Sequence, residues 1–189
     1  MTPPAAPWSD DVGDSEWLVH DAVVAWETPF FEAGYDVVER PNGNRANYFW
    51  LEPSDAVIVL AVDDGEVVAV EQYCPRHRMR EIGLPAGGVD EGEDPAAAAR
   101  RELREETGYR AGTVTHVESY VPSGWVRYRR HVYVAEDLTP GDPDLNEGEW
   151  IETDTVPADE VIDVVRGRDG PVNGGALTPL LLAREEGLL

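Results

Sequence analysis

Four glutamates in one short segment have the types and spacing that could do chemistry. Glu102, Glu105 and Glu106 lie at positions i, i+3 and i+4, so a helix would place all three on one side. Glu93 lies just upstream, after a glycine-rich turn. Carboxylates held together repel one another unless cations neutralise them, and hard divalent ions such as Mg²⁺ prefer oxygen ligands. Because metal-loaded carboxylates commonly serve phosphate chemistry, the pattern predicts a hydrolase of phosphate esters or pyrophosphates.

The local sequence predicts a helix through these glutamates. Asp94 is a suitable N-cap, Pro95 suits the first helical position, and the alanines that follow have high helix propensity. Gly108 is placed to end the helix in a left-handed conformation. The plainer interpretation is an exposed helix held by salt bridges, as charged runs usually are. The glycine-rich loop that leads directly into the acids favours a metal site instead.

The segment from Gly87 to Tyr109 resembles the Nudix box, G-x5-E-x7-R-E-U-x-E-E-x-G-U, in which U is a bulky apolar residue. Every fixed position is filled in register, by Gly87, Glu93, Arg101, Glu102, Leu103, Glu105, Glu106, Gly108 and Tyr109. Tyr109 is unorthodox, because an aliphatic residue is usual there. Graded similarity to the ADP-ribose pyrophosphatase branch covers about residues 17 to 165, including Leu84-Pro85-Ala86-Gly87 and Pro122-Ser123-Gly124.

This resemblance implies an α/β fold, the Nudix-type α/β/α sandwich with a mixed β-sheet, and a hydrolase that needs Mg²⁺ or Mn²⁺. The expected metal ligands are the Ala86 backbone carbonyl, Glu102, Glu105, Glu106 and Glu149. The expected catalytic residues are Glu147, Glu105 and Arg101. Glu147 would activate water as general base, and Arg101 would pair with a box carboxylate such as Glu93. Glu147 and Glu149 would otherwise be ordinary solvated loop acids.

Substrate contacts are expected from arginines and an aromatic residue outside the box. The candidates are Arg76, Arg80, Pro122, Trp125, Arg127 and Arg129. Two departures from the ADP-ribose branch stand out: Gly83 replaces its usual glutamate, and arginines follow Gly124 where an acid is common. Arginines suit phosphate oxygens, although Arg129 could instead merely offset neighbouring acids.

Three functions therefore compete. ADP-ribose, cleaved to AMP and ribose 5-phosphate, is the leading substrate. A house-cleaning nucleoside triphosphate pyrophosphohydrolase is favoured if the arginines grip a triphosphate. A non-catalytic nucleotide-binding module is the third, and the complete set of box carboxylates argues against it.

Composition narrows the partners. The net charge is −23 and all fifteen basic residues are arginine, which disfavours nucleic acid and anionic membranes and leaves a small nucleotide. The charge suggests a halophilic, salt-adapted protein, whereas a GC-rich genome would equally explain the missing lysine. Cys74 is the single cysteine, so no disulfide framework is expected, and it is interpreted as a small buried residue. His77, His116 and His131 are taken as structural because they lack metal-ligand spacing.

The chain is expected to have three regions. Residues 1–15 read as a disordered acidic lead without a signal peptide, and no apolar run has transmembrane length, so a cytoplasmic protein is expected. Residues 16–52 read as an N-terminal β-region that makes a homodimer in the resembling branch, and 53–189 as the hydrolase domain with its box at 87–109. Strands are expected at 17–26, 34–39, 46–51, 57–62, 67–72, 114–121 and 131–135, with further helices at 158–166 and 177–186.

Overall fold

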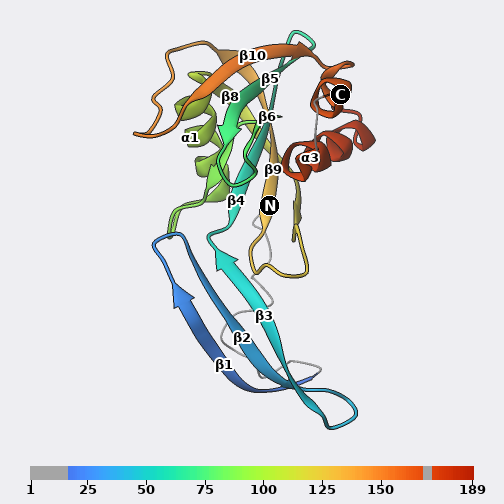
Figure 1. Cartoon of the computed structure of the whole chain (residues 1–189). Coiled ribbons are helices and arrows are strands. Elements are labelled where there is room, and N and C mark those ends of the chain that lie inside the picture. The colour runs from blue at the N-terminus through green and yellow to red at the C-terminus, as the bar shows by residue number, and fades with distance from the viewer. Residues whose placement is uncertain (1–16, 168–171) are drawn as a thin grey trace. The chain divides into compact units, whose positions relative to one another are not determined.

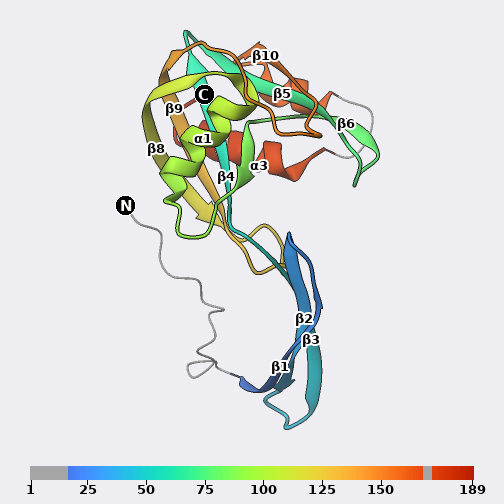
Figure 2. The same cartoon turned by 90° about the vertical axis from the view of Figure 1, so that its left-hand side faces the viewer.

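The computed structural model describes residues 17–167 and 172–189, which form two compact units (Figures 1 and 2). The first unit contains the described residues up to Asp55 together with Ser119–Arg130. The second contains Ala56–Glu118 and the described part of His131–Leu189. The sequence interpretation had assigned residues 119–130 to the hydrolase region. The expected acidic lead at 1–15 lies outside the described residues.

The first unit is a three-stranded antiparallel meander in the order β1 (Leu18–Glu27), β2 (Phe31–Glu39) and β3 (Arg45–Pro53). The Thr28 hydroxyl caps the first turn by accepting backbone hydrogen bonds at 3.0 and 3.1 Å. The predicted turn at Asn42-Gly43 is confirmed: Gly43 has a φ of +79°, which glycine adopts readily.

Trp50 of β3 joins this sheet to the 119–130 segment. Its indole N–H donates to Asp36 Oδ1 at 2.9 Å, and the Arg127 guanidinium carbon lies 4.5 Å from the ring centroid. Arg127 also pairs with Asp36. The Leu51 N–H donates to the Trp125 carbonyl at 3.0 Å, and the Arg127 N–H donates to the Leu51 carbonyl at 2.8 Å. Backbone and side chains together therefore fix the segment to β3.

The second unit contains a seven-stranded sheet. Its main order is β10 (Ile151–Pro157), β5 (Glu66–Cys74), β4 (Ala56–Asp63), β9 (Arg130–Thr139) and β8 (Arg110–Tyr120). Two short strands complete it: β6 (Met79–Gly83) pairs with β5, and β7 (Ala86–Gly88) pairs with β4. β7 aligns Ala86 with Ile58 and Gly87 with Val57, so the start of the Nudix box is fixed to a core strand.

Helices cover both faces of this sheet, as Figure 1 shows for α1 and α3. Alternate residues of β4 point to opposite faces, which is why its apolar run is buried throughout. One face packs against α1 (Pro95–Thr107) through Val57, Val59, Ala61, Ala98, Ala99 and Leu103. The other packs against α2 (Val161–Arg166) and α3 (Gly174–Glu185) through Ile58, Leu60, Val161, Val165, Leu180 and Ala183. The predicted α/β/α sandwich is confirmed.

α1 begins and ends where its local sequence predicts. The Asp94 carboxylate accepts from the N–H groups of Ala96 and Ala97, at 3.2 and 3.3 Å, and Pro95 occupies the first turn. Gly108 ends the helix with a φ of +80° and donates its N–H to the Arg104 carbonyl. The remaining two helix predictions are displaced: α2 begins later than expected, and α3 begins earlier, capped by the Asn173 side chain.

Three strands were not predicted: β6, β7 and β10. β10 is mostly exposed along its length, so no apolar alternation marks it in the sequence. β7 has three residues, two of them glycine. Within residues 17–167 and 172–189, no helix has the length and apolar character needed to cross a membrane.

Candidate active site

Glu106 is a buried carboxylate, with 7 % of its surface exposed. Its Oε2 accepts a hydrogen bond from the Ala86 backbone N–H at 2.9 Å. Burial raises its pKa to about 8, because a buried carboxylate loses its hydration, and the negative charges of Glu102 and Glu149 add to that rise. The Ala86 N–H opposes the rise but does not cancel it. The surroundings of Glu106 therefore disfavour its negative charge, and a bound cation would stabilise it.

Glu102 lies directly against the backbone of Gly87. A Cβ added at Gly87 would lie 2.1 Å from the Glu102 carboxyl carbon, so only glycine allows this approach. Burial raises the pKa of Glu102; the Arg101 guanidinium opposes that effect, and the charges of Glu105 and Glu149 reinforce it. Glycine is therefore required at the first box position because the Glu102 carboxylate occupies the space that a side chain would need.

Arg101 organises the carboxylates around it. Its Nε and one terminal nitrogen donate to the two oxygens of Glu93, at 3.0 and 2.8 Å, and this pairing lowers the pKa of Glu93. Its other terminal nitrogen donates to Glu102 at 2.6 Å and to Glu105 at 3.4 Å. A further bond to the Gly88 carbonyl, at 2.8 Å, connects the helix to β7. The expected pairing of Arg101 with Glu93 is present.

The loop after β9 is attached to the same helix. The Asp144 N–H donates to the Glu105 carbonyl at 2.9 Å. Within the helix, Arg104 donates to the Glu105 carboxylate at 2.7 Å, a contact that was not predicted from the sequence. Glu149 of this loop lies close enough to raise the pKa of Glu102 and Glu106. Glu147, the expected base, is exposed in the same loop.

The charge and donor chemistry of these carboxylates suit a hard divalent cation. The charge of Glu149 raises the pKa of both Glu102 and Glu106, whereas Arg101 directs two of its bonds to Glu93. The bond that Glu106 accepts comes from a neutral backbone N–H. Carboxylate oxygens in a partly buried setting, with negative charge in excess, are the donor set that Mg²⁺ and similar ions take. Glu102, Glu106 and Glu149, with Glu105 beside them, therefore remain the predicted ligands of such an ion.

The expected substrate residues are divided between the two units. In the second unit, Arg80 pairs with Glu71 and Glu152, at 2.8 and 2.6 Å, and Arg76 is exposed in the turn after β5. In the first unit lie Pro122, Trp125, Arg127 and Arg129.

Within that first unit the predicted substrate residues differ in how firmly they are held. Arg127 is fixed by Asp36 and Trp50, and the Arg129 N–H donates to Asp55 at 2.7 Å. Trp125 is 69 % exposed and available for stacking. In the second unit Trp150, which follows Glu149, is 85 % exposed and is likewise available for stacking. It was not among the substrate residues predicted from the sequence. An aromatic residue directly after a candidate ligand was the available signal.

Comparison with known proteins identifies the family of this chain. Residues 52–173 match the NUDIX domain family. An ADP-ribose pyrophosphatase from Bacillus subtilis is 34 % identical over 136 residues, which cover 70 % of this chain and 74 % of that protein. A CMP-5'-(N-acetyl-N-hydroxy-3-aminopropyl)phosphonate hydrolase from Streptomyces rubellomurinus is 32 % identical over 168 residues, covering 85 % and 79 %. A solved ADP compounds hydrolase shares the fold, with a TM-score of 0.79 at 23 % identity over 91 % of this chain and 95 % of that one.

Proposed function

This chain belongs to the Nudix family, and we propose that it hydrolyses the pyrophosphate linkage of ADP-ribose to AMP and ribose 5-phosphate. The observation that carries the proposal is that Glu102 and Glu106 both lie against the Ala86–Gly87 backbone, and that the charge of Glu149 raises the pKa of both. The named activity of the Bacillus subtilis relative supports the choice of substrate.

The proposed cofactor is Mg²⁺ or Mn²⁺, since Nudix hydrolases generally use divalent metals. Its ligands would be the Ala86 carbonyl, Glu102, Glu105, Glu106 and Glu149. When bound, the ion neutralises phosphate charge and acidifies a water molecule. The chain's own part is to hold the carboxylates in place: Arg101 orients those on one side of α1, and the Ala86 N–H orients Glu106.

Glu147 is the proposed general base. Its carboxylate would take a proton from water as the water oxygen bonds to phosphorus and the bridging P–O bond breaks, so that the second phosphate leaves. The Asp144 N–H attaches this loop to α1, and Gly148 has a φ of +100°, so the loop is both anchored and sharply turned. We expect Glu147→Gln to lower kcat about a hundredfold, and Asp142→Asn, an exposed acid of the same loop, to leave it within about twofold.

Product analysis tests the substrate. The purified protein is incubated with Mg²⁺ and ADP-ribose, a CMP phosphonate ester, or a nucleoside triphosphate, and products are separated by anion exchange. AMP with ribose 5-phosphate supports the proposal. Pyrophosphate release from triphosphates, without ADP-ribose cleavage, would establish the triphosphate pyrophosphohydrolase instead. Tight nucleotide binding without turnover at any Mg²⁺ or Mn²⁺ concentration would establish a binding module.

The first unit also supports a homodimer. Its three-stranded sheet exposes several large apolar side chains that a second copy would cover. They are Leu18, Val24, Trp26, Phe30, Tyr48 and Phe49. Light scattering is expected to give twice the chain mass of 20.8 kDa. Phe30→Ser, at a position 80 % exposed, is expected to shift the protein towards the monomer, and an unchanged dimer at micromolar concentration would place the interface elsewhere.

A further inference from the structure

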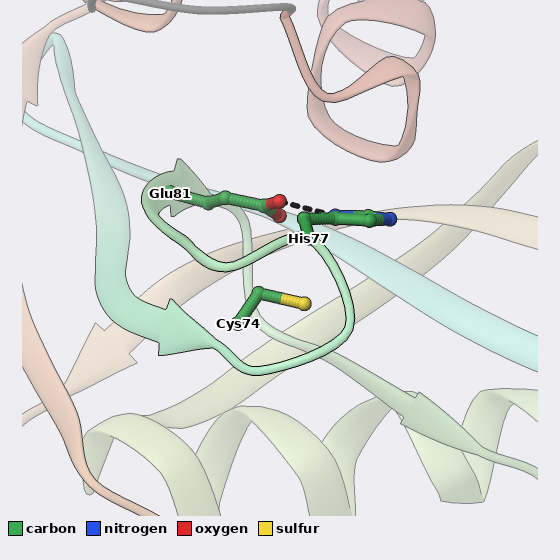
Figure 3. Close-up of side chains that lie close together, drawn as sticks. All are labelled: Cys74, His77 and Glu81. Carbon is green, nitrogen blue, oxygen red and sulfur yellow. Dashed lines mark hydrogen bonds and ion pairs between the residues drawn. The ribbon is translucent and has the colours of Figure 1, made fainter.

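We propose that Cys74, His77 and Glu81 form a second metal site, for Zn²⁺ or a similar transition metal, distinct from the carboxylate cluster (Figure 3). The thiol, an imidazole nitrogen and a carboxylate oxygen all lie within 4.8 Å of one another. From the sequence, His77 was predicted to be structural and Cys74 to be a small buried residue, and Glu81 was not singled out. The inference goes beyond pyrophosphate hydrolysis and does not depend on it.

Strand register brings the three residues together. Cys74 ends β5 and pairs with Met79, the first residue of β6. Glu81 lies two positions beyond Met79, so it projects from the same face of the sheet as Cys74. His77 lies in the connecting turn and is directed over this face, as Figure 3 shows.

The turn that carries His77 is itself held in place. The Cys74 carbonyl accepts hydrogen bonds from the N–H groups of His77 and Arg78, at 3.2 and 2.7 Å. Arg78 has a φ of +58°, a left-handed conformation that side chains other than glycine rarely adopt. Its arginine side chain is exposed, so solvent weakens its repulsion of a bound cation. The backbone therefore holds the imidazole close to the thiol.

A hydrogen bond from a neighbouring helix cap orients the Glu81 carboxylate. The Glu81 side chain is only 10 % exposed, and its Oε2 accepts a hydrogen bond from Asn173 at 2.5 Å. Asn173 is in turn fixed as the N-cap of α3, because its Oδ1 accepts from the Gly175 N–H at 2.8 Å. This leaves Oε1 directed at His77 Nδ1, with which it pairs. A hydrogen-bonded partner that orients a ligating carboxylate is the usual support of a metal site.

The donor set selects the metal. Thiolate and imidazole favour Zn²⁺ and similar transition metals, whereas Mg²⁺ prefers oxygen. Tetrahedral Zn²⁺, with bonds of about 2.0–2.3 Å, separates neighbouring ligand atoms by about 3.3–3.7 Å. Bringing ligand atoms that are 4.8 Å apart to this spacing requires a shift of about 1 Å. The His77 side chain is 57 % exposed and has room for such a shift. The ion would replace the His77–Glu81 contact and keep one coordination position open for water.

The single cysteine makes the test specific, because any thiol signal reports this site alone. Stoichiometric Zn²⁺ is expected to slow the reaction of Cys74 with a thiol reagent at least tenfold, and Mg²⁺ is expected to have no effect. Both His77→Asn and Glu81→Gln should lose most of that protection. Glu106→Gln, in the separate carboxylate cluster, is the matched control and should retain it.

Co²⁺ provides a direct readout on the unmodified protein. A thiolate-to-cobalt charge-transfer band is expected in the wild type and is expected to be absent from Cys74→Ser. Failure of Zn²⁺ to protect the wild-type thiol, or equal protection in the His77 variant, would overturn the site. Cys74→Ser should keep its Mg²⁺-dependent hydrolysis, so a failed zinc site and a failed pyrophosphatase are told apart.

Discussion

Replacing Glu106 by glutamine should stabilise the metal-free protein while abolishing its activity. The carboxylate is buried, and its pKa rises from the ordinary 4.5 to about 8. The native state therefore disfavours the charged form of Glu106. The resulting loss in the free energy of unfolding is absent well below pH 4.5 and grows as the pH rises towards 8. Converted to free energy, the upper limit of that cost is about 3 kcal/mol at pH 7 and about 5 kcal/mol above pH 8.

The increase in the free energy of unfolding that Glu106→Gln produces is expected to be smaller than this limit. The glutamine oxygen keeps the hydrogen bond from Ala86, but its amide N–H₂ becomes a buried donor that costs about 1–3 kcal/mol if unpaired. We therefore expect a gain of about 0–2 kcal/mol at pH 7 and a larger one above pH 8, and for a chain of this length each kcal/mol raises Tm by about 2–4 °C. Near pH 5 the gain should vanish, because native Glu106 is then protonated and the remaining cost, about 1 kcal/mol, no longer exceeds that of burying the amide.

The assay is thermal unfolding in a chelating buffer between pH 5 and pH 9, with kcat measured in parallel at saturating Mg²⁺. The variant should lose about a hundredfold or more in kcat. Glu105→Gln is the matched control on the same helix: its carboxylate accepts hydrogen bonds from Arg101 and Arg104, so neutralising it should give no gain. A Glu106 variant that melts at or below the wild-type temperature throughout pH 7–9 would refute the electrostatic reasoning.

Four other outcomes are expected. Protons compete with the cation at Glu106, so the half-saturating Mg²⁺ concentration for activity should rise about tenfold for each pH unit below 8; a flat profile would exclude Glu106 as a ligand. Gly87→Ala should lower kcat at least tenfold, because its Cβ would lie 2.1 Å from the Glu102 carboxyl carbon, whereas Gly88→Ala, with open space around it, should be near wild type in the same steady-state assay. Arg101→Lys should lower both Tm and kcat, since one ammonium group cannot reproduce the forked contacts; unchanged values would contradict its organising role. Raising KCl from 0.1 to 1 M should raise Tm, because a net charge of −23 repels itself less when screened, and a lower Tm would contradict salt adaptation.

Local signals account for the parts of the site that could be predicted from sequence. The cap at Asp94, the proline at the first helical position and the glycine at 108 each act within a few residues, and α1 begins and ends there. The i, i+3, i+4 spacing then places the glutamates on one side without any knowledge of the fold. The strands of the sandwich core were equally visible, because β4 and β5 are apolar on both faces.

The features that were missed depend on partners far away in the sequence. The contacts of Arg127, which stays a predicted substrate residue, are one such feature: it pairs with Asp36, 91 residues earlier, and lies over Trp50. β10 is found only by its pairing with β5, because its own residues are mostly polar and exposed. The approach of His77 to Glu81 likewise depends on the turn between β5 and β6, whose register no short motif encodes.

The cost of burying Glu106 is itself an argument about function. An uncharged side chain at that position would give a more stable metal-free protein, and the Ala86 N–H would still have an acceptor in glutamine. Arg101 could have been directed at this carboxylate, yet the structure directs it to Glu93, Glu102 and Glu105. Among the described residues Glu106 accepts no bond from a cationic side chain, which is explained if a divalent ion supplies the partner, since binding then recovers the cost of desolvation. The instability of the metal-free site and its proposed affinity for metal would therefore be two consequences of the same carboxylate.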